Sequence, residues 1–192
     1  MPETATSARK TIALIGYRGS GKTTIGKLLA ERLGTTLIDL DLLVKARIGT
    51  SIAEFFTTQG EDAFRDHESA ALAEVLASPP GVLATGGGVI LREANRALLR
   101  ANCFVVWLRA PAEWLWQNIN ADPLSKFNRP SLTLQFGIEE VKSVLKQREE
   151  TYRDLATLVV DATQNPEVVA EEISGFLTSH RVDPGAFQSL PA

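Results

Sequence analysis

Residues 16–23 read Gly-Tyr-Arg-Gly-Ser-Gly-Lys-Thr and fit the phosphate-loop pattern G-x-x-x-x-G-K-[S/T] at every fixed position. The apolar, β-branched run 11–15 before them predicts a buried strand. Residues 24–32 after them place apolar side chains on one side at helical spacing. Strand, glycine loop and helix N-terminus make an anion site, because the loop's N–H groups point inward and the helix dipole favours phosphate.

The loop predicts an ATP or GTP site and says nothing about the acceptor. Its glycines let the backbone wrap closely around phosphates. We expect Lys22 to reach the β- and γ-phosphates and the Thr23 hydroxyl to ligate Mg²⁺. A chance match on a glycine-rich turn is the alternative, and the flanking strand and helix argue against it.

Composition excludes several classes of protein. A chain of 192 residues is most simply one domain, and 44% hydrophobic residues suffice for a packed core. The formal charge of −3 gives no electrostatic case for nucleic-acid binding. We see no apolar run near the roughly 20 residues of a membrane span and no signal-peptide core at the start. Cys103, the single cysteine, lies in an apolar run and predicts a buried thiol. We expect a soluble, cytoplasmic protein without nucleic-acid or membrane partners.

The rest of the chain alternates strands with helices, which predicts a parallel sheet covered on both faces. Further strands are expected at 36–39, 81–85, 103–108 and 158–161. Helices are expected to start at the capping box of Ser51 and to cover 61–77, 92–100, 112–118, 138–152 and 167–177, the last opened by Asn165-Pro166. The fold class is therefore α/β, with a five-stranded parallel sheet in a three-layer α/β/α arrangement.

The domain organisation is one unit, residues 10–178, between a flexible N-terminus at 1–9 and a C-terminal tail at 179–192. Residues 121–137 interrupt the alternation with prolines and glycine. A loop of this length in a compact domain is often functional, so we expect a mobile lid that closes over the nucleotide. A mere surface excursion is the alternative.

Two carboxylates follow the second predicted strand, at Asp39 and Asp41. Side chains two apart on a strand point the same way, so both should lie at the carboxyl edge of the sheet, where open α/β sheets bind ligands. One carboxylate would serve Mg²⁺, and the other would accept a proton from a substrate hydroxyl. The alternative is that Asp41 only caps the following helix.

The run Gly86-Gly87-Gly88 follows the third predicted strand. It lets the backbone approach a ligand or makes a tight turn, and both interpretations remain open. Arg65, Arg129 and Arg148 are either surface residues or bidentate partners of carboxylate and phosphate, and the residues alone do not choose between these roles.

Taken together, these motifs resemble the shikimate kinase family over about residues 10–178. All of them occur in order, at separations similar to those of the family. The matching residues are the loop 16–23, Asp39-Leu40-Asp41, Gly60-Glu61 with Phe64-Arg65 and Glu68, Thr85-Gly86-Gly87-Gly88, Arg129-Pro130, and Arg148 with Tyr152.

The resemblance implies transfer of the γ-phosphoryl of ATP to the 3-hydroxyl of shikimate, a step towards chorismate and the aromatic amino acids. It implies catalytic roles for Lys22, Asp41 and Arg129, and Mg²⁺ at Thr23 and Asp39. Shikimate would be bound by Asp41, Arg65, Gly87 and Arg148, the two arginines holding its carboxylate. ATP would be bound by Gly19, Ser20, Gly21, Lys22, Thr23, Thr24, Arg129 and Gln164.

Two rival interpretations remain. One is another small-metabolite kinase of similar fold, such as a gluconate or nucleoside-monophosphate kinase. The other is a nucleotide-binding homologue that has lost catalysis. The Asp39 and Asp41 pair, Arg65 and the glycine run argue against the first, and intact Lys22 and Thr23 argue against the second. We expect a monomer whose partners are ATP and shikimate.

Overall fold

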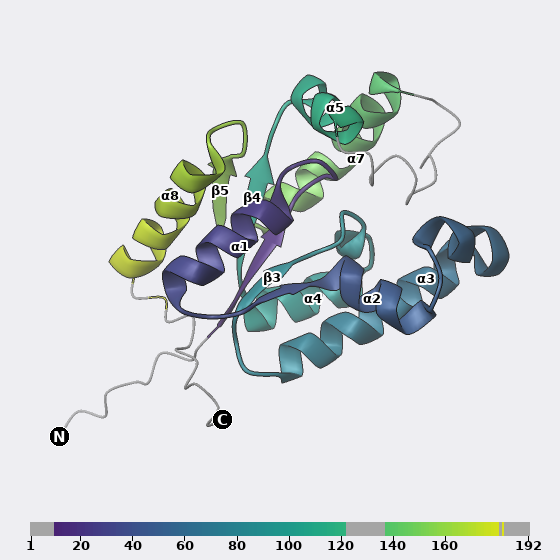
Figure 1. Ribbon diagram of the computed structural model, residues 1–192, viewed down its shortest axis with the longest axis horizontal. Coiled ribbons are helices and arrows are strands. Elements are labelled where there is room, and N and C mark those ends of the chain that lie inside the picture. The colour runs from purple at the N-terminus through teal and green to yellow at the C-terminus, as the bar shows by residue number, and fades with distance from the viewer. Residues whose placement is uncertain (1–9, 122–136, 181, 183–192) are drawn as a thin grey trace.

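Five parallel strands form one sheet in the computed structural model, which describes residues 10–121, 137–180 and 182 (Figure 1). The strand order is β2-β3-β1-β4-β5, with β1 in the centre. The strands are β1 Thr11–Ile15, β2 Leu37–Asp39, β3 Val82–Ala84, β4 Cys103–Arg109 and β5 Leu158–Asp161. The predicted five-stranded parallel sheet is confirmed, and each strand lies within one residue of its expected position.

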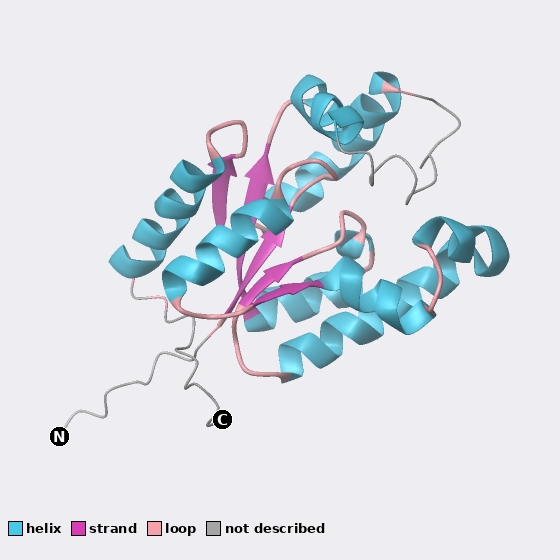
Figure 2. Cartoon of the chain, viewed as in Figure 1, coloured by secondary structure: helices cyan, strands magenta, loops and turns pink. Residues whose placement is uncertain are grey.

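Helices cover both faces of this sheet and give the predicted three layers (Figure 2). They are α1 Lys22–Leu33, α2 Leu40–Ile48, α3 Ile52–Ala77, α4 Glu93–Asn102, α5 Ala112–Ala121, α7 Ile138–Leu155 and α8 Pro166–Ser179, with the 3₁₀ turn η1 Val89–Leu91. Two of the predicted helix starts are confirmed by their capping bonds. Ser51 Oγ accepts from the Glu54 N–H at 3.1 Å, and Asn165 Oδ1 accepts from the Glu167 N–H at 2.9 Å.

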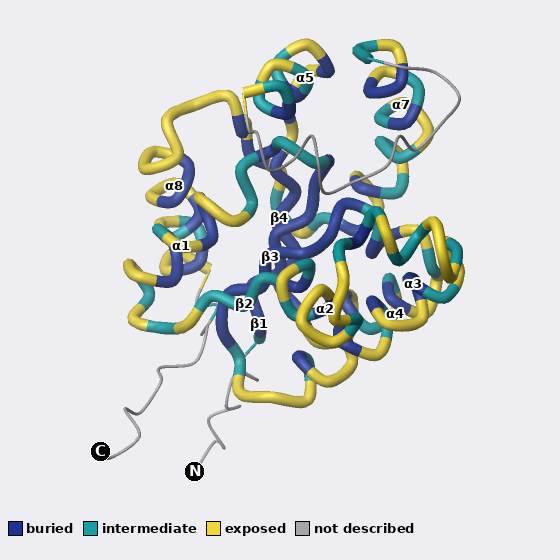
Figure 3. The backbone as a smooth tube through the Cα atoms, turned by 45° about the vertical axis from the view of Figure 1, so that its right-hand side comes forward, coloured by how far each residue is buried: buried dark blue, intermediate teal, exposed yellow. Residues whose placement is uncertain are grey.

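The hydrophobic core lies on the two faces of the sheet, and alternate residues of each strand serve opposite sides. Ile12 and Leu14 of β1 pack with the side of α1 and α8, whereas Ala13 and Ile15 pack with the side of α3 and α4. Figure 3 shows β1, β3 and β4 as the buried centre and the outer turns of the helices as exposed. Trp116 of α5 packs against the first of these cores.

The strand register brings the site residues to one edge of the sheet. Leu14 lies beside Ala84, and Asp39 lies beside the same Ala84 on the other side of β3. The loops that leave the carboxyl ends of β1, β2 and β3 are therefore neighbours. This is the edge at which open α/β sheets bind their ligands.

Two local features differ from the sequence-based expectation. A helix, α2, begins at Leu40 directly after β2, although none was predicted there. The two helices expected near residues 51 and 61 run together as α3 and meet at a kink at Gly60, where φ is 84° and ψ is 169°. Within the described ranges, no helix is both long enough and apolar enough to cross a membrane.

Cys103 begins β4 and is 4% exposed, which confirms the predicted buried thiol. Burial raises its pKa to about 12, so at about pH 8 only roughly one thiol in ten thousand is ionised. We expect Ellman's reagent to leave this thiol unmodified in the folded protein and to label it fully in denaturant. Rapid stoichiometric labelling of the folded protein would contradict this placement.

Candidate active site

The phosphate loop joins the end of β1 to the start of α1 with glycines that no other residue could replace without strain. Gly19 and Gly21 have φ of 81° and 82°, in the left-handed region. A Cβ on Gly16 would lie 2.7 Å from the Leu108 carbonyl, and one on Gly19 would lie 2.9 Å from the Leu115 carbonyl. The loop is thus packed tightly against β4 and α5, and Asn118 Nδ2 also donates to the Gly19 carbonyl at 3.0 Å.

Lys22 holds its ammonium over the inside of this loop. Its Nζ donates to the carbonyls of Gly16 and Tyr17 at 3.0 and 2.9 Å. The side chain of Ser20, also in the loop, is fully buried. A positive charge therefore stands beside the N-terminus of α1, where the helix dipole adds to it. This arrangement suits a polyphosphate.

Thr23 and Asp39 bring two oxygens together across the loops that follow β1 and β2. Thr23 Oγ1 donates to Asp39 Oδ2 at 2.7 Å, and Asp39 Oδ1 accepts from the Leu42 N–H at 3.2 Å. A hydroxyl beside a carboxylate fits a hard cation such as Mg²⁺, which takes few protein ligands and shares the rest with phosphates and water. No group of three His, Cys, Asp or Glu able to hold a metal exists in the described ranges.

The prediction that Asp39 and Asp41 project the same way from a strand is wrong. The strand ends at Asp39, which is the N-cap of α2, so Asp41 lies in the first turn of a helix. The alternative that Asp41 caps this helix is also wrong, since Asp39 does so. The two carboxylates consequently serve different places, Asp39 beside Thr23 and Asp41 in a separate pocket.

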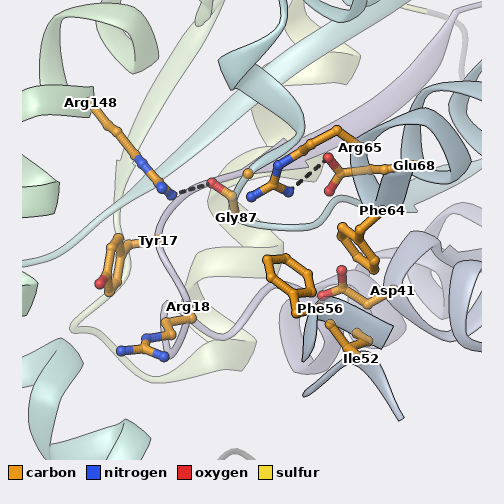
Figure 4. Close-up of a pocket in the computed structure, with 11 residues that line it drawn as sticks. Tyr17, Arg18, Asp41, Ile52, Phe56, Phe64, Arg65, Glu68, Gly87 and Arg148 are labelled. Atoms are coloured by element: carbon orange, nitrogen blue, oxygen red, sulfur yellow. Dashed lines mark hydrogen bonds and ion pairs between the residues drawn. The ribbon is translucent and has the colours of Figure 1, made fainter. Parts of the chain in front are cut away.

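That pocket lies next to the phosphate loop and combines an apolar wall with charged side chains (Figure 4). Its residues come from the loop after β1, from α2, α3 and α7, and from the glycine run after β3. They are Tyr17, Arg18, Asp41, Ile52, Phe56, Phe64, Arg65, Glu68, Gly87, Gly88 and Arg148. A small molecule with both an apolar ring and polar groups would match such a lining. We call it the acceptor pocket.

Arg65 is fixed in the acceptor pocket by two carboxylates and two rings. Its Nη1 donates to Glu68 Oε2 at 3.1 Å and its Nη2 to Glu61 Oε1 at 2.8 Å. The guanidinium carbon lies 6.0 Å from the ring centroid of Phe56 and 5.5 Å from the ring centroid of Phe64. Burial raises the pKa of the Glu68 carboxyl, while the adjacent Arg65 charge pulls that pKa down. The guanidinium is held in one orientation before any ligand binds.

The glycine run owes its composition to the side chains around it. A Cβ on Gly86 would lie 2.6 Å from both Asp41 Oδ1 and Glu68 Oε1, and one on Gly88 would overlap the Arg65 guanidinium. Of the two interpretations left open, the tight turn is present, since the Val89 N–H donates to the Gly86 carbonyl at 3.2 Å, and charged side chains of the protein itself also lie close to the run. Approach of this backbone to a ligand stays a prediction. A side chain here would displace the charges of the acceptor pocket.

The Gly87 carbonyl ties α7 to this run. Arg148 Nη1 donates to it at 2.9 Å, and the buried Tyr152 hydroxyl donates at 3.2 Å. Tyr152 in turn stacks on Trp107 of β4, with ring centroids 5.6 Å apart. Figure 4 shows Arg148 and Arg65 reaching the glycine run from opposite sides.

The structure brings most of the predicted site residues together. Asp41, Arg65, Gly87 and Arg148 line one pocket, and Lys22, Thr23 and Asp39 stand at the adjoining loop. Gln164 is exposed in the turn between β5 and α8, outside the acceptor pocket. Arg129 and the predicted lid, apart from its ends at Ala121 and Gly137, lie outside the described residues.

Sequence reasoning missed several lining residues, above all Arg18. It also missed the partner of Arg18, Glu140, which is 122 positions away and does not line the pocket. Nothing local in the sequence signals such a contact. It also gave Glu68 no role of its own, although three residues separate it from Arg65, the spacing of an ion pair on one helix face. That spacing is a signal the sequence did contain.

Comparison with known proteins fits this geometry. The family model described as shikimate kinase matches residues 18–178. "Shikimate kinase 2" of Yersinia enterocolitica is 44% identical over 173 residues, which cover 90% of this chain and 98% of that protein.

Solved structures agree. A shikimate kinase from Acinetobacter baumannii in complex with shikimate has a TM-score of 0.83 at 32% identity, covering 94% of this chain and 99% of that one. Shikimate kinase from Aquifex aeolicus has a TM-score of 0.76 at 29% identity, covering 90% and 99%. A gluconokinase from Sinorhizobium meliloti has a TM-score of 0.61 at 21% identity, covering 89% and 93%, and shares the fold alone. The chain belongs to the shikimate kinase family.

Proposed function

We propose that this protein transfers the γ-phosphoryl group of ATP to the 3-hydroxyl of shikimate, giving shikimate 3-phosphate on the route to chorismate and the aromatic amino acids. The observation that carries the proposal is a pocket with Asp41, Arg65 and Arg148, opening beside a phosphate loop. Shikimate is a cyclic triol with one carboxylate, and these groups match it. The shikimate-bound relative from Acinetobacter baumannii supports the same conclusion.

The donor half is assigned to the phosphate loop and its surroundings. Backbone N–H groups from Gly19 to Thr24 would hold the phosphates, and Lys22 would neutralise the transferred group. Thr23 and Asp39 would hold Mg²⁺, which would offset the charge of the phosphates. Contacts of ATP with Arg129 and Gln164 stay predictions, as do the cytoplasmic location and the monomeric state.

The acceptor half is assigned to four residues. Arg65 and Arg148 would hold the carboxylate, because a guanidinium offers it paired N–H donors. Gly87 would lie against the ring with its backbone, since it has no side chain. Asp41 would orient the reacting hydroxyl and accept its proton. The apolar wall of Ile52, Phe56 and Phe64 would pack against the ring carbons.

Catalysis would come mainly from positioning and charge, because the transition state of phosphoryl transfer is loose. The oxygen of the acceptor hydroxyl attacks phosphorus, the bond to the ADP oxygen breaks, and the hydroxyl proton passes to Asp41. Lys22 stabilises charge on the phosphoryl oxygens. The separation of the two carboxylates fits this mechanism, since Asp39 lies beside Thr23 in the donor half and Asp41 lines the acceptor pocket.

The direct test measures ADP formation with and without shikimate and identifies the product by mass. We expect turnover that depends on shikimate and a product heavier by one phosphoryl group. A panel of other hydroxylated acceptors, gluconate included, separates the rival kinase. Tight ATP binding without transfer to any acceptor would instead indicate a non-catalytic homologue.

Asp41→Asn should lose turnover far more than ATP binding, because the amide cannot accept the hydroxyl proton. We expect kcat to fall by about 10²- to 10⁴-fold, the usual contribution of a general base. Steady-state kinetics and ATP titration measure the two effects. Asp66→Asn, an exposed carboxylate on α3, is the control. Unchanged turnover in Asp41→Asn would refute the assignment.

Arg65→Ala should mainly weaken shikimate binding, because it removes a charged bidentate donor. We expect the KM for shikimate to rise at least about tenfold, as for loss of one charge-assisted hydrogen bond. Arg92→Ala, which breaks an exposed ion pair with Asp66, is the matched control. Normal shikimate affinity together with poor ATP affinity would contradict the role given to Arg65.

A further inference from the structure

An ion pair joins the phosphate loop to the start of α7. Arg18 Nη2 donates to Glu140 Oε1 at 2.7 Å. The Glu140 side chain is 3% exposed and that of Arg18 15%, so the pair is largely shielded from water. Arg18 also lines the acceptor pocket, whereas Glu140 is not among the lining residues. Glu140 is therefore a buried carboxylate that acts on the pocket through another side chain.

The surroundings make Arg18 dependent on this carboxylate. Its Nε and the Tyr17 hydroxyl beside it are both buried with no hydrogen-bond partner that the structure describes. Burial raises the pKa of Tyr17, so this phenol stays neutral and cannot offset the Arg18 charge. Removing one partner of a buried ion pair leaves the other uncompensated, which is costly. Glu140 is well placed to set where the guanidinium points.

Helix α7 carries two residues that bond to different parts of the site. Glu140 and Arg148 are eight residues apart on α7, about 12 Å along the helix and about 80° apart around it, so both lie on one broad side of the helix. Arg148 is bonded to the Gly87 carbonyl, while Glu140 is bonded to the phosphate loop. Glu140 and Arg148 thus connect α7 to the phosphate loop and to the glycine run, which both border the acceptor pocket.

We propose that Glu140 is a positioning residue of the acceptor half: it holds the Arg18 guanidinium at the wall of the pocket, where Arg18 adds a third positive charge to those of Arg65 and Arg148. The inference rests on the proposed function and deepens it. Arg18 is the residue of the pair that lines the acceptor pocket, and Glu140 determines the orientation of its guanidinium without lining the pocket itself.

The test is a double-mutant cycle with Arg18→Met, Glu140→Gln and the combination, read by kinetics with shikimate and by thermal unfolding. Each single variant should raise the KM for shikimate about tenfold, the effect of one charge-assisted bond, while the dissociation constant of ATP stays within about twofold. The double variant should raise the KM no further, because both changes remove the same oriented charge.

Unfolding temperatures separate positioning from loss of structure. Glu140→Gln should raise the KM for shikimate at temperatures well below its unfolding transition, where the variant is folded. Glu140→Gln with an unchanged KM would overturn the proposal, as would a double variant whose KM rises by the product of the two single effects.

Two further variants complete the design. Glu149→Gln breaks another α7 ion pair, to Arg109 at 3.0 Å, away from the acceptor pocket, and should leave the KM unchanged. Arg18→Lys keeps the charge but not the guanidinium that bonds Glu140, so its KM should rise even if Glu140→Gln fails to fold. An unchanged KM in Arg18→Lys would count against the proposal.

Absence of shikimate-dependent turnover in the wild-type chain would instead overturn the proposed function.

Discussion

Both halves of the site are positioned by the parallel pairing of β1 with β3 on one side and β4 on the other. Because β1 lies in the middle of the sheet, the loop that leaves it is flanked by the ends of neighbouring strands. The Gly16 and Gly19 backbones then approach β4 and α5 too closely for any side chain. A polyphosphate site and a neighbouring pocket follow from one edge of one sheet.

The acceptor pocket keeps several charges in a confined volume, and glycine is what makes room for them. Arg65 and Glu68 are almost fully buried, and such charges persist only when they are paired. The backbone at Gly86 and Gly88 passes so near these groups that a methyl group would meet a carboxylate or a guanidinium. The glycines in the loop after β3 and the paired charges on α3 therefore depend on each other, because the charges occupy the space that side chains in the loop would need.

The sequence predicted the strands well because each is an apolar, β-branched run, and it predicted the residues that carry charge at the strand ends. It failed at Asp39-Leu40-Asp41, where strand periodicity was extended two residues beyond the point at which Asp39 caps a helix. It could not foresee the bond of Arg18 to Glu140, since two residues 122 apart are brought together only by the packing of α7 on the loop. Local propensity indicates elements, whereas contacts between distant elements depend on the whole fold.

The kink in α3 divides that helix's contribution to the acceptor pocket between two helical segments. Ile52 and Phe56 precede Gly60, while Phe64, Arg65 and Glu68 follow it. A Cβ at Gly60 would touch nothing within 4 Å, so glycine is required there for its φ of 84° alone. The angle between the part of α3 that carries Ile52 and Phe56 and the part that carries Phe64, Arg65 and Glu68 is thus set by one residue that does not line the pocket. Changes at this hinge would alter the size of acceptor admitted while leaving the phosphate loop intact, which gives evolution a way to alter selectivity without rebuilding the donor half.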